Sequence, residues 1–351
     1  MFDLSSKINY NVFLGEKMKK SIKALIVILA ILVCLGGLCL VYFFGATYTA
    51  YSPIAKIEFK IPGLNDSLCP QGMCYVEDEN LWLVSGYSCK NDEKSKIYVV
   101  DDKSGEVIKY FTIQSQNEKF ESAHFCGVAQ YDDVVWIATD GYLLLLSFDD
   151  VLSVANAGEV EVLSEFDTKT GADFIQIYDG KLYVGDFYRQ GYSKENATHK
   201  VKVSNQQTNY ALMLEFPINL NLENKIETTP TLAISIPNQV QGFVFGENGA
   251  AIFSTSYSLP DSKFYVYEKM SSLEDNATIS LSFGDIPLKV YSNEDLNQIL
   301  EGPCMSEALC LKGDRVYILY ESACDKYKLF TRTRTNVVHS IKLTDFFVEE
   351  K

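Results

Sequence analysis

The sequence predicts an all-β protein, a β-propeller with five blades most favoured, preceded by one apolar transmembrane helix. Residues 68–89 and 303–324 can be superimposed without a gap, and each copy carries two cysteines at matching positions. The same hairpin pattern recurs three more times, and helical periodicity is nearly absent after residue 46, apart from a short candidate at 293–300. Four-stranded antiparallel modules that recur along a chain are typical of a propeller, in which neighbouring blades cover each other's faces.

The N-terminal run from Ala24 to Ala46 holds no charged residue and is long enough to span about 30 Å of hydrocarbon. Four lysines precede it directly: Lys17, Lys19, Lys20 and Lys23. The positive-inside rule therefore predicts a cytoplasmic segment 1–23, a transmembrane anchor 24–46, a linker 47–54 and an extracytoplasmic domain 55–351 at the cell membrane. A cleaved secretory signal that begins at Met18 is the alternative and would give a secreted protein. The apolar run exceeds the usual signal core, which favours a retained signal-anchor.

Each module contains two β-rich runs separated by a turn signal, which is typical of a hairpin. The three further modules begin at His124, Gly171 and Gln239, and their turns read "YDD", "YDG" and "GENG". Third strands are expected at 95–101 and 262–268, and fourth strands at 106–113, 159–166, 232–237 and 288–292. The segment 56–63 is expected to close the ring by completing the C-terminal blade.

Two alternatives to this architecture remain open. The long stretches 188–230 and 266–303 are either insertions or the sequence of a sixth blade. A β-sandwich also consists of antiparallel strands, but it gives no reason for the same hairpin to recur five times.

The hairpin geometry suggests a role for the cysteines. The start of the innermost strand and the end of the second strand are antiparallel neighbours, at a separation that suits a disulfide. We therefore predict the disulfide bonds Cys69–Cys89 and Cys304–Cys324, which an extracytoplasmic location would allow to persist. Metal binding by these thiols is the competing hypothesis, but no Cys-x-x-Cys spacing supports it and an oxidising compartment argues against it.

The same geometry predicts where a ligand would bind. Residues before each first strand and after each second strand open on one face of the ring, around the central channel. Cys126 and Asp140 are among them, and the polar residues form a candidate binding site for a polar ligand or a hard cation such as calcium, with Asp173 and Glu307 as its candidate metal ligands. The candidate ligand-binding residues are Gln71, Tyr87, His124, Asp173, Asp186, Tyr188, Arg189, Gln241, Tyr257, Glu307 and Glu321.

The repeated "GKLYV" and "SKIYVVD" hairpins resemble those of gluconolactonase-like calcium-binding propellers. The anchored five-module layout also resembles calcium-activated apyrases and arabinanase-like glycosidases. These likenesses cover roughly residues 55–345 and concern the fold. No metal triad or nucleotide-contact set of those families matches residue by residue, so the resemblance implies the architecture and assigns no catalytic residue.

The composition and the absence of certain motifs exclude several classes of function. The formal net charge of −15 opposes nucleic-acid binding, which depends on clustered Lys and Arg. The sequence also lacks the nucleophile elbow, the phosphate-binding glycine loop and the zinc-protease motif. Our first interpretation is a membrane-anchored propeller that binds a small polar molecule, a glycan or a protein, with no catalytic step assigned. The alternatives are a hydrolase of glycosidase, lactonase or nucleotide phosphohydrolase type that uses Glu307 and Asp173, and a structural scaffold of an envelope complex.

Overall fold

The computed structural model describes residues 4–90, 93–191, 199–203, 207–273 and 276–347. The chain divides into two compact units, Met1–Thr47 and Tyr48–Lys351. Helix α1 (Leu4–Phe44) forms the first unit. Its stretch Ile22–Phe43 has a mean hydropathy of 3.2 and is long and apolar enough to cross a membrane. This is compatible with a single-pass anchor or with a signal sequence.

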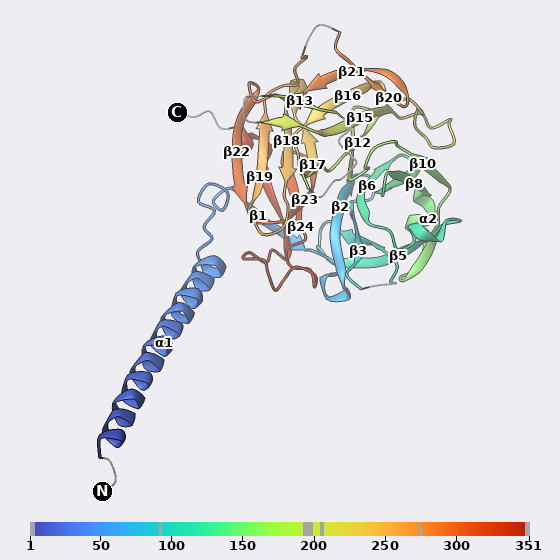
Figure 1. Ribbon diagram of the computed structural model, residues 1–351. Helices are drawn as coiled ribbons and strands as arrows, with labels where there is room; N and C mark the ends of the chain where they lie inside the picture. Colours follow the sequence, from blue (N-terminus) through green and yellow to red (C-terminus); the bar gives the residue numbers. More distant parts are fainter. Residues whose placement is uncertain (1–3, 91–92, 192–198, 204–206, 274–275, 348–351) are drawn as a thin grey trace. The chain divides into compact units, whose positions relative to one another are not determined.

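The second unit is a five-bladed β-propeller (Figure 1), as the sequence predicted. Its innermost strands are β2, β6, β11, β17 and β23, and each contacts the next one around the ring. Blade 1 contains β2 (Leu68–Val76), β3 (Leu81–Ser88), β4 (Lys96–Asp101), β5 (Val107–Gln114) and β9 (Gly158–Glu161). Blade 2 contains β6 (Phe125–Tyr131), β7 (Val134–Thr139), β8 (Tyr142–Ser147) and β10 (Ser164–Asp167).

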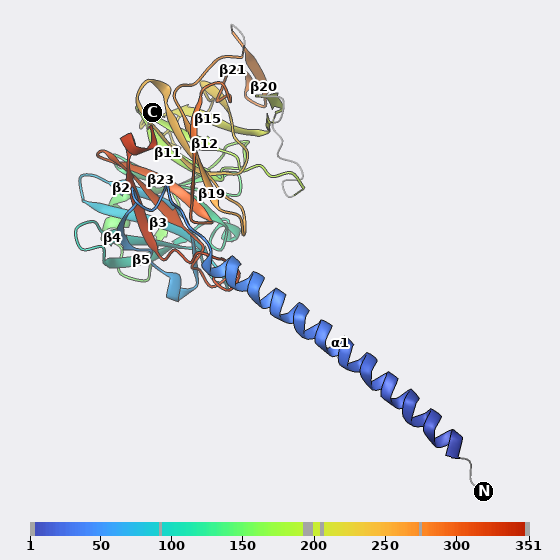
Figure 2. The ribbon, with the colours of Figure 1, turned by 90° about the vertical axis from the view of Figure 1, so that its left-hand side faces the viewer.

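Blades 3 and 4 follow the same order, with additions at the outer edge of blade 3. Blade 3 contains β11 (Phe174–Tyr178), β12 (Lys181–Gly185), β15 (Ala211–Pro217) and β16 (Leu232–Ile236). Its edge is extended by β21 (Gly284–Val290) and β20 (Thr278–Leu281), which lie at the top of Figures 1 and 2. Blade 4 contains β17 (Val240–Phe245), β18 (Ala251–Thr255), β19 (Ser262–Tyr267) and β22 (Leu296–Gly302).

Blade 5 joins both ends of the propeller sequence. It contains β23 (Ser306–Lys312), β24 (Arg315–Tyr320), β25 (Val337–Lys342) and β1 (Lys56–Lys60). Strand β1 pairs antiparallel with β25, with Lys56 opposite Ser340, so the ring closure predicted from segment 56–63 is confirmed. Helix α2 (Phe148–Ser153), the strands β13 (Val201–Lys202) and β14 (Thr208–Asn209), and short 3-10 turns at 64–66, 118–120, 247–249 and 343–346 complete the unit.

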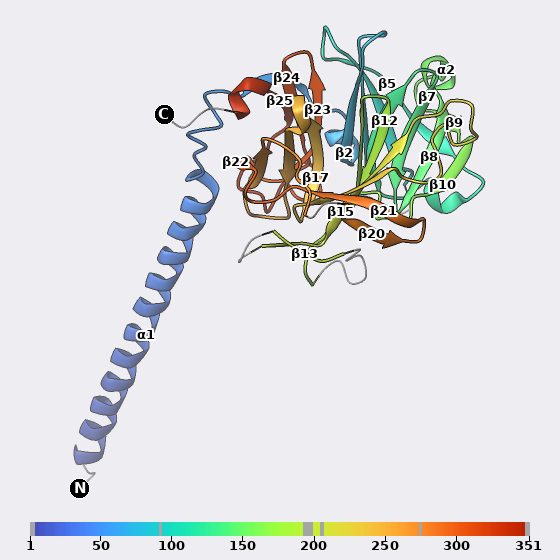
Figure 3. The same cartoon turned by 90° about the horizontal axis from the view of Figure 1, so that it is seen from above.

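The two long stretches do not form a sixth blade: each combines an insertion with one regular blade strand, β15 of blade 3 in the first and β22 of blade 4 in the second. The first carries the small β13–β14 hairpin, seen at the bottom of the propeller in Figure 3, and the second carries β20 and β21, which extend blade 3 beyond β16. Two details of the prediction were wrong. The helix candidate at 293–300 forms most of strand β22, because pairing with β19 in an open sheet edge overrides its weak local preference. Residues 288–290 extend the edge of blade 3 and do not supply the fourth strand of blade 4.

The hairpin turns contain residues with positive φ, as their sequences predict. Asn, Asp and Gly tolerate this left-handed conformation better than other residues do. At least one member of each turn signal adopts it, and two members do so in the third and fourth modules: Asn80, Asp132, Asp179, Gly180, Asn248, Gly249 and Gly313. These turns fix the register of the innermost hairpins. They therefore fix the position of each innermost strand along the axis of the channel.

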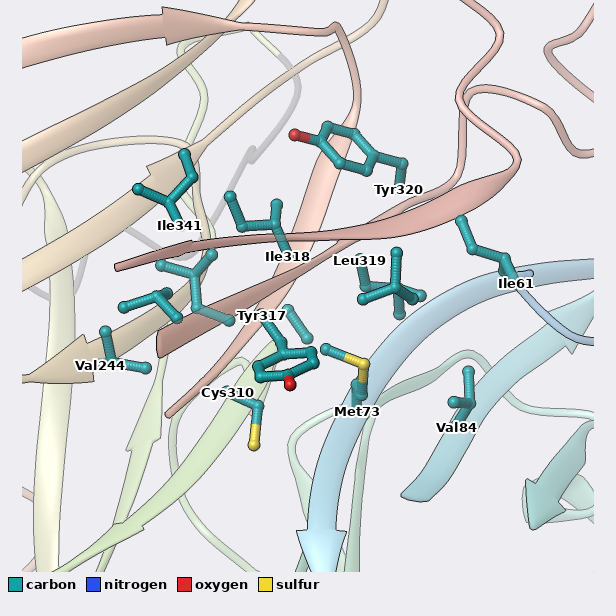
Figure 4. Close-up of a cluster of buried hydrophobic side chains, with 14 of the residues drawn as sticks. Ile61, Met73, Val84, Val244, Cys310, Tyr317, Ile318, Leu319, Tyr320 and Ile341 are labelled. Atoms are coloured by element: carbon teal, nitrogen blue, oxygen red, sulfur yellow. The ribbon is translucent and has the colours of Figure 1, made fainter. Parts of the chain in front are cut away.

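A large hydrophobic cluster fills the space between blades 5, 1 and 4. Figure 4 shows Met73 of β2 pointing toward Tyr317 and Leu319 of β24. The cluster also contains Tyr51, which is 1% exposed and belongs to the stretch expected to be a linker. Its hydroxyl lies 2.5 Å from that of Tyr320 and 2.9 Å from Nδ1 of His339. The residues just after the apolar helix are therefore packed into the propeller.

Candidate functional site

A pocket of about 520 Å³ opens where the innermost strands begin and the second strands end. It is lined by residues from all five blades, as the hairpin geometry predicted. The lining residues are Gln71, Tyr87, His124, Cys126, Asp140, Asp173, Phe187, Gln241, Tyr257, Ser258, Met305, Glu321, Lys326 and Tyr327. This volume is in the range of small-molecule sites.

Glycines allow the innermost strands to approach one another below this pocket. A Cβ atom on Gly72 would lie 2.7 Å from the Cα of Gly127, and one on Gly242 would lie 2.8 Å from the Cα of Ala308. Real side chains do not reach such distances, so these strands can pack only with glycine at these positions. The polar residue that precedes each glycine, Gln71 or Gln241, is thereby held at the pocket wall.

Seven of the eleven candidate residues line the pocket, namely Gln71, Tyr87, His124, Asp173, Gln241, Tyr257 and Glu321. The other four lie behind or beside it. Glu307 and Asp186 are buried, and Tyr188 is packed in the core against Tyr210, with ring centroids 4.7 Å apart. Arg189 places its guanidinium 3.8 Å from the ring centroid of Tyr257. A ligand-binding role for any of the eleven stays a prediction.

One side of the pocket carries two aspartates, Asp173 and Asp140. Asp173 directly precedes β11, and its Oδ2 accepts a hydrogen bond of 2.6 Å from the backbone N–H of Phe187. Burial, followed by repulsion from Asp186 and Asp140, raises the pKa of Asp173 to about 7. Burial also raises the pKa of Asp140. These carboxyl groups therefore hold protons more firmly than ordinary aspartates do.

Another side carries a pair of glutamates. The Oε2 atom of Glu321 accepts hydrogen bonds from Nε2 of Gln71 at 2.9 Å and from the thiol of Cys69 at 3.0 Å. Burial raises the pKa of Glu321 to about 7. Burial and the neighbouring Glu321 raise the pKa of Glu307 well above its usual range. The two glutamates interact directly, so near neutral pH the pair retains a proton.

Aromatic rings and one lysine form the rest of the rim. The rings of Tyr87 and His124 lie 4.1 Å apart between centroids. Lys326 donates a 2.7 Å hydrogen bond to the Tyr87 hydroxyl and lies over the rings of Tyr87 and Tyr327, 4.8 and 5.0 Å from their centroids. Burial, with a smaller effect from Lys326, lowers the pKa of His124 to about 4, so its imidazole is neutral at pH 7.

Sequence reasoning missed five lining residues. Phe187, Ser258 and Met305 are adjacent in sequence to predicted exit or entry positions, so a window one residue wider would have included them. Lys326 and Tyr327 belong to the long connection between β24 and β25. The length of that connection was no signal, because the exit from β12 to β15, residues 186–210, is longer still.

Neither predicted disulfide is present, and each of the nine cysteines, all within the described ranges, is a free thiol. The β2–β3 register places Cys69 opposite Tyr87, so Cys89 is a diagonal neighbour of Cys69. Diagonal neighbours are about 7–8 Å apart, beyond the usual span of a disulfide of about 4.4–6.8 Å. Cys324 lies in the turn after β24, 3.3 Å from Cys69 between sulfur atoms, while Cys304 directs its thiol to the carbonyl of Thr333 at 3.5 Å.

The calcium hypothesis stays untested. Within the described part of the chain, the only group of three acidic, histidine or cysteine side chains with donor atoms close enough for one ion is Cys69, Cys89 and Cys324. Asp173 and Glu307 do not converge in this way. Because calcium takes six to eight oxygen ligands, a calcium ion here would depend on backbone and water oxygens.

No family model matches the chain, and no curated protein matches its sequence. Among solved structures, the chain is similar to glutaminyl cyclase from Myxococcus xanthus, with 8% identity, a TM-score of 0.44 and coverage of 82% of this chain and 95% of that chain. It is also similar to the PQQ-bound aldose sugar dehydrogenase from Streptomyces coelicolor, with 11% identity, a TM-score of 0.45 and coverage of 82% and 97%. BamB from Moraxella catarrhalis is 10% identical, with a TM-score of 0.33 and coverage of 78% and 83%. These likenesses concern the fold alone.

Proposed function

We propose that the propeller binds a small organic cation, a molecule with a primary ammonium group, in the pocket at the channel mouth. The observation that carries the proposal is the charge of the lining. Three carboxyl groups, those of Asp140, Asp173 and Glu321, line the pocket, and Lys326 is its only lysine or arginine in the described lining. Such an excess of carboxyl groups, with Asp173 partly buried and Glu321 almost fully buried, is costly unless protons or a bound cation neutralise it.

The carboxyl groups suit an ammonium ligand in another respect. An ammonium group offers three N–H donors, and carboxylates are strong acceptors for them. Because burial raises the pKa of both Asp173 and Glu321 to about 7, the empty pocket retains protons near neutral pH. A bound cation would favour the ionised carboxylates, so binding should release protons and should strengthen as the pH rises through 7.

The aromatic rim supports the same ligand class. Tyr87, Tyr257, Phe187 and Tyr327 line the pocket, and the face of an aromatic ring attracts a cation. Three of these rings already hold a cation, since Arg189 lies over Tyr257 and Lys326 lies over both Tyr87 and Tyr327. A ligand with an ammonium group and an apolar body would therefore find partners for both parts. If the apolar helix is an uncleaved anchor with its lysines in the cytoplasm, this binding would take place on the extracytoplasmic side of the membrane.

The test is calorimetric titration of the purified full chain with a matched pair of ligands, a short alkyl diamine and the diol of the same length. The diamine should bind and the diol should not. Asp173→Asn should weaken diamine binding at least about tenfold, since a hydrogen bond to a charged group contributes about 1.5–3 kcal/mol. Asp285→Asn, an exposed aspartate on β21 and outside the pocket, is the control and should bind normally. The proposal would be refuted if the diamine and the diol bound equally well. It would also be refuted if Asp173→Asn and Asp285→Asn bound the diamine equally well.

A second candidate function, hydrolysis, is favoured by one observation. Carboxyl groups with a pKa near 7 suit general acid–base catalysis, and Asp173 and Glu321 both have one. Glu307, the partner expected from the sequence, does not line the pocket, so Glu321 takes its place in this hypothesis. Incubation of the protein with a panel of glycosides, lactones and nucleotides tests it. Turnover that disappears in both Asp173→Asn and Glu321→Gln would support hydrolysis, and no turnover of any substrate would count against it.

A further inference from the structure

Three thiols from opposite ends of the propeller sequence meet beside the pocket. Cys69 begins β2, Cys89 follows β3, and Cys324 lies in the turn after β24. Their sulfur atoms all lie within 4.8 Å of one another. Cys69 and Cys324 are fully buried, and Cys89 is partly exposed, which leaves a route by which an ion can enter.

We propose that Cys69, Cys89 and Cys324 bind one zinc ion and thereby link blade 1 to blade 5. Zinc–sulfur bonds of about 2.3 Å in a tetrahedron place sulfur atoms about 3.8 Å apart. The observed 3.3 Å between Cys69 and Cys324, and the 4.8 Å limit for all three, bracket this separation. The side chains therefore need only small movements to bind the metal.

A fourth ligand is within reach. The carboxylate of Glu321 already lies 3.0 Å from the Cys69 sulfur and is 7% exposed. Carboxylate oxygen is an accepted zinc ligand, and a set of three thiolates and one carboxylate would complete a closed tetrahedral site. All four side chains would then have a partner.

A disulfide explains the cluster less well. It would use two of the three thiols and leave the third buried or half-buried beside it without a role. It would also need backbone movement for the Cys69–Cys89 pair, because these residues are diagonal neighbours across the β2–β3 hairpin. A metal ion uses all three sulfur atoms in the positions that they occupy.

The position of the site gives it a structural consequence. Blades 1 and 5 contain the first and last innermost strands of the ring, and β2 contacts β23 directly across this boundary. A metal held by Cys69 and Cys89 on one side and Cys324 on the other would hold the two blades together. A ligand that binds only the folded state raises the midpoint of unfolding, so zinc should do so here.

The chain offers a matched control for the test. Cys304 is fully buried like Cys69 and occupies the equivalent position in the repeated sequence, but it lies outside the cluster, and a serine there can also donate to the Thr333 carbonyl. The full chain is purified in detergent without oxygen, and its zinc content is measured by mass spectrometry. We expect one zinc per chain in the wild type and in Cys304→Ser, and loss of zinc in Cys69→Ser and Cys324→Ser.

A measurement on the unmutated protein keeps the test independent of variant folding. Metal-free protein is titrated with cobalt(II), whose thiolate complexes absorb by charge transfer, and the absorption should saturate at one equivalent. After removal of metal and unfolding, all nine cysteines should react with a thiol reagent before any reductant is added. Absence of the cobalt–thiolate absorption would overturn the proposal. So would the reaction of only seven thiols, which indicates a disulfide, or equal loss of zinc in Cys304→Ser. Amine binding plays no part in these readouts, so the two proposals fail independently.

Discussion

Replacement of Asp173 by asparagine should stabilise the empty protein at pH 8 and leave its stability unchanged near pH 4. Burial is the largest cause of the raised pKa of Asp173, followed by repulsion from Asp186 and Asp140. The pKa rises from 3.8 to about 7, so the unfolded chain ionises this carboxyl group much more readily than the folded protein does. Folding then has to keep a proton on the group or accept a buried charge, and asparagine avoids both.

The sign follows from linkage. Well below the unfolded pKa of 3.8 the carboxyl group is protonated in both states, and its stabilising contribution is fully present. As the pH rises from about 4 to about 7, the unfolded state loses its proton first, and the free energy of unfolding falls by about 1.4 kcal/mol per pH unit. Between low pH and pH 7, the free energy of unfolding falls by about 4 kcal/mol in total. Asp173 is half-buried and solvent reaches it from the pocket. We therefore expect Asp173→Asn to raise the free energy of unfolding by about 2–4 kcal/mol above pH 7.

Urea denaturation of the wild type and Asp173→Asn at pH 4.5, 6 and 8 measures this difference. The asparagine oxygen can still accept the hydrogen bond from the Phe187 N–H, so the local structure should persist. Asp285→Asn serves as the control and should show no dependence on pH of this kind. A variant less stable than the wild type at pH 8, or a difference of the same size at all three pH values, would refute the reasoning.

Two further substitutions test the packing that supports the site. Gly242→Ala should lower the free energy of unfolding by about 1–3 kcal/mol, because the new methyl group would lie 2.8 Å from the Cα of Ala308, and an unchanged urea midpoint would contradict the close approach of these strands. Tyr51→Phe should cost about 1–3 kcal/mol, because it leaves the buried hydroxyl of Tyr320 without its partner. Thermal unfolding of the full chain measures the second effect, and an unchanged melting temperature would show that the stretch after the helix is not held by this contact.

The blades could be predicted from sequence because their signals are local and repeated. Turn residues such as Asn80, Asp132 and Asp179 adopt the positive φ that their types favour, and the runs around them alternate as strands do. The insertions could not be assigned in the same way. Residues 296–300 carry a weak helical pattern, and only the free edge of β19, which the sequence does not reveal, decides that they form a strand.

The pocket could be predicted in outline for a geometric reason. In every blade, residues near the start of the innermost strand and near the end of the second strand meet at the channel mouth, so Gln71, His124 and Asp173 could be placed together from the sequence. The sequence did not predict how deeply each of these side chains is buried. Glu307 and Glu321 look equivalent to the other entry and exit residues, yet only Glu321 reaches the pocket, because the irregular start of the β23–β24 pairing turns Glu307 toward the interior.

The cysteine prediction failed because it rested on proximity and not on register. A shift of two residues along β3 separates a directly opposed pair from a diagonal one, and the bulge between Pro70 and Gly72 lies beside this end of the hairpin. Sequence identity between the two repeats was equally misleading for Cys304, because the chain after Tyr320 turns toward blade 1 and takes Cys324 with it.

The connection that follows β24 supplies Glu321, Cys324, Lys326 and Tyr327 to one corner of the site. Glu321 belongs to both proposed sites, since it lines the pocket and also accepts from the Cys69 thiol. If zinc takes its carboxylate, the pocket loses one of three groups that would hold an ammonium ligand. Thermodynamic linkage then requires that each cation weaken the binding of the other by the same factor. The boundary between the first and last blades would thus serve two purposes, closing the ring and setting the charge of the pocket.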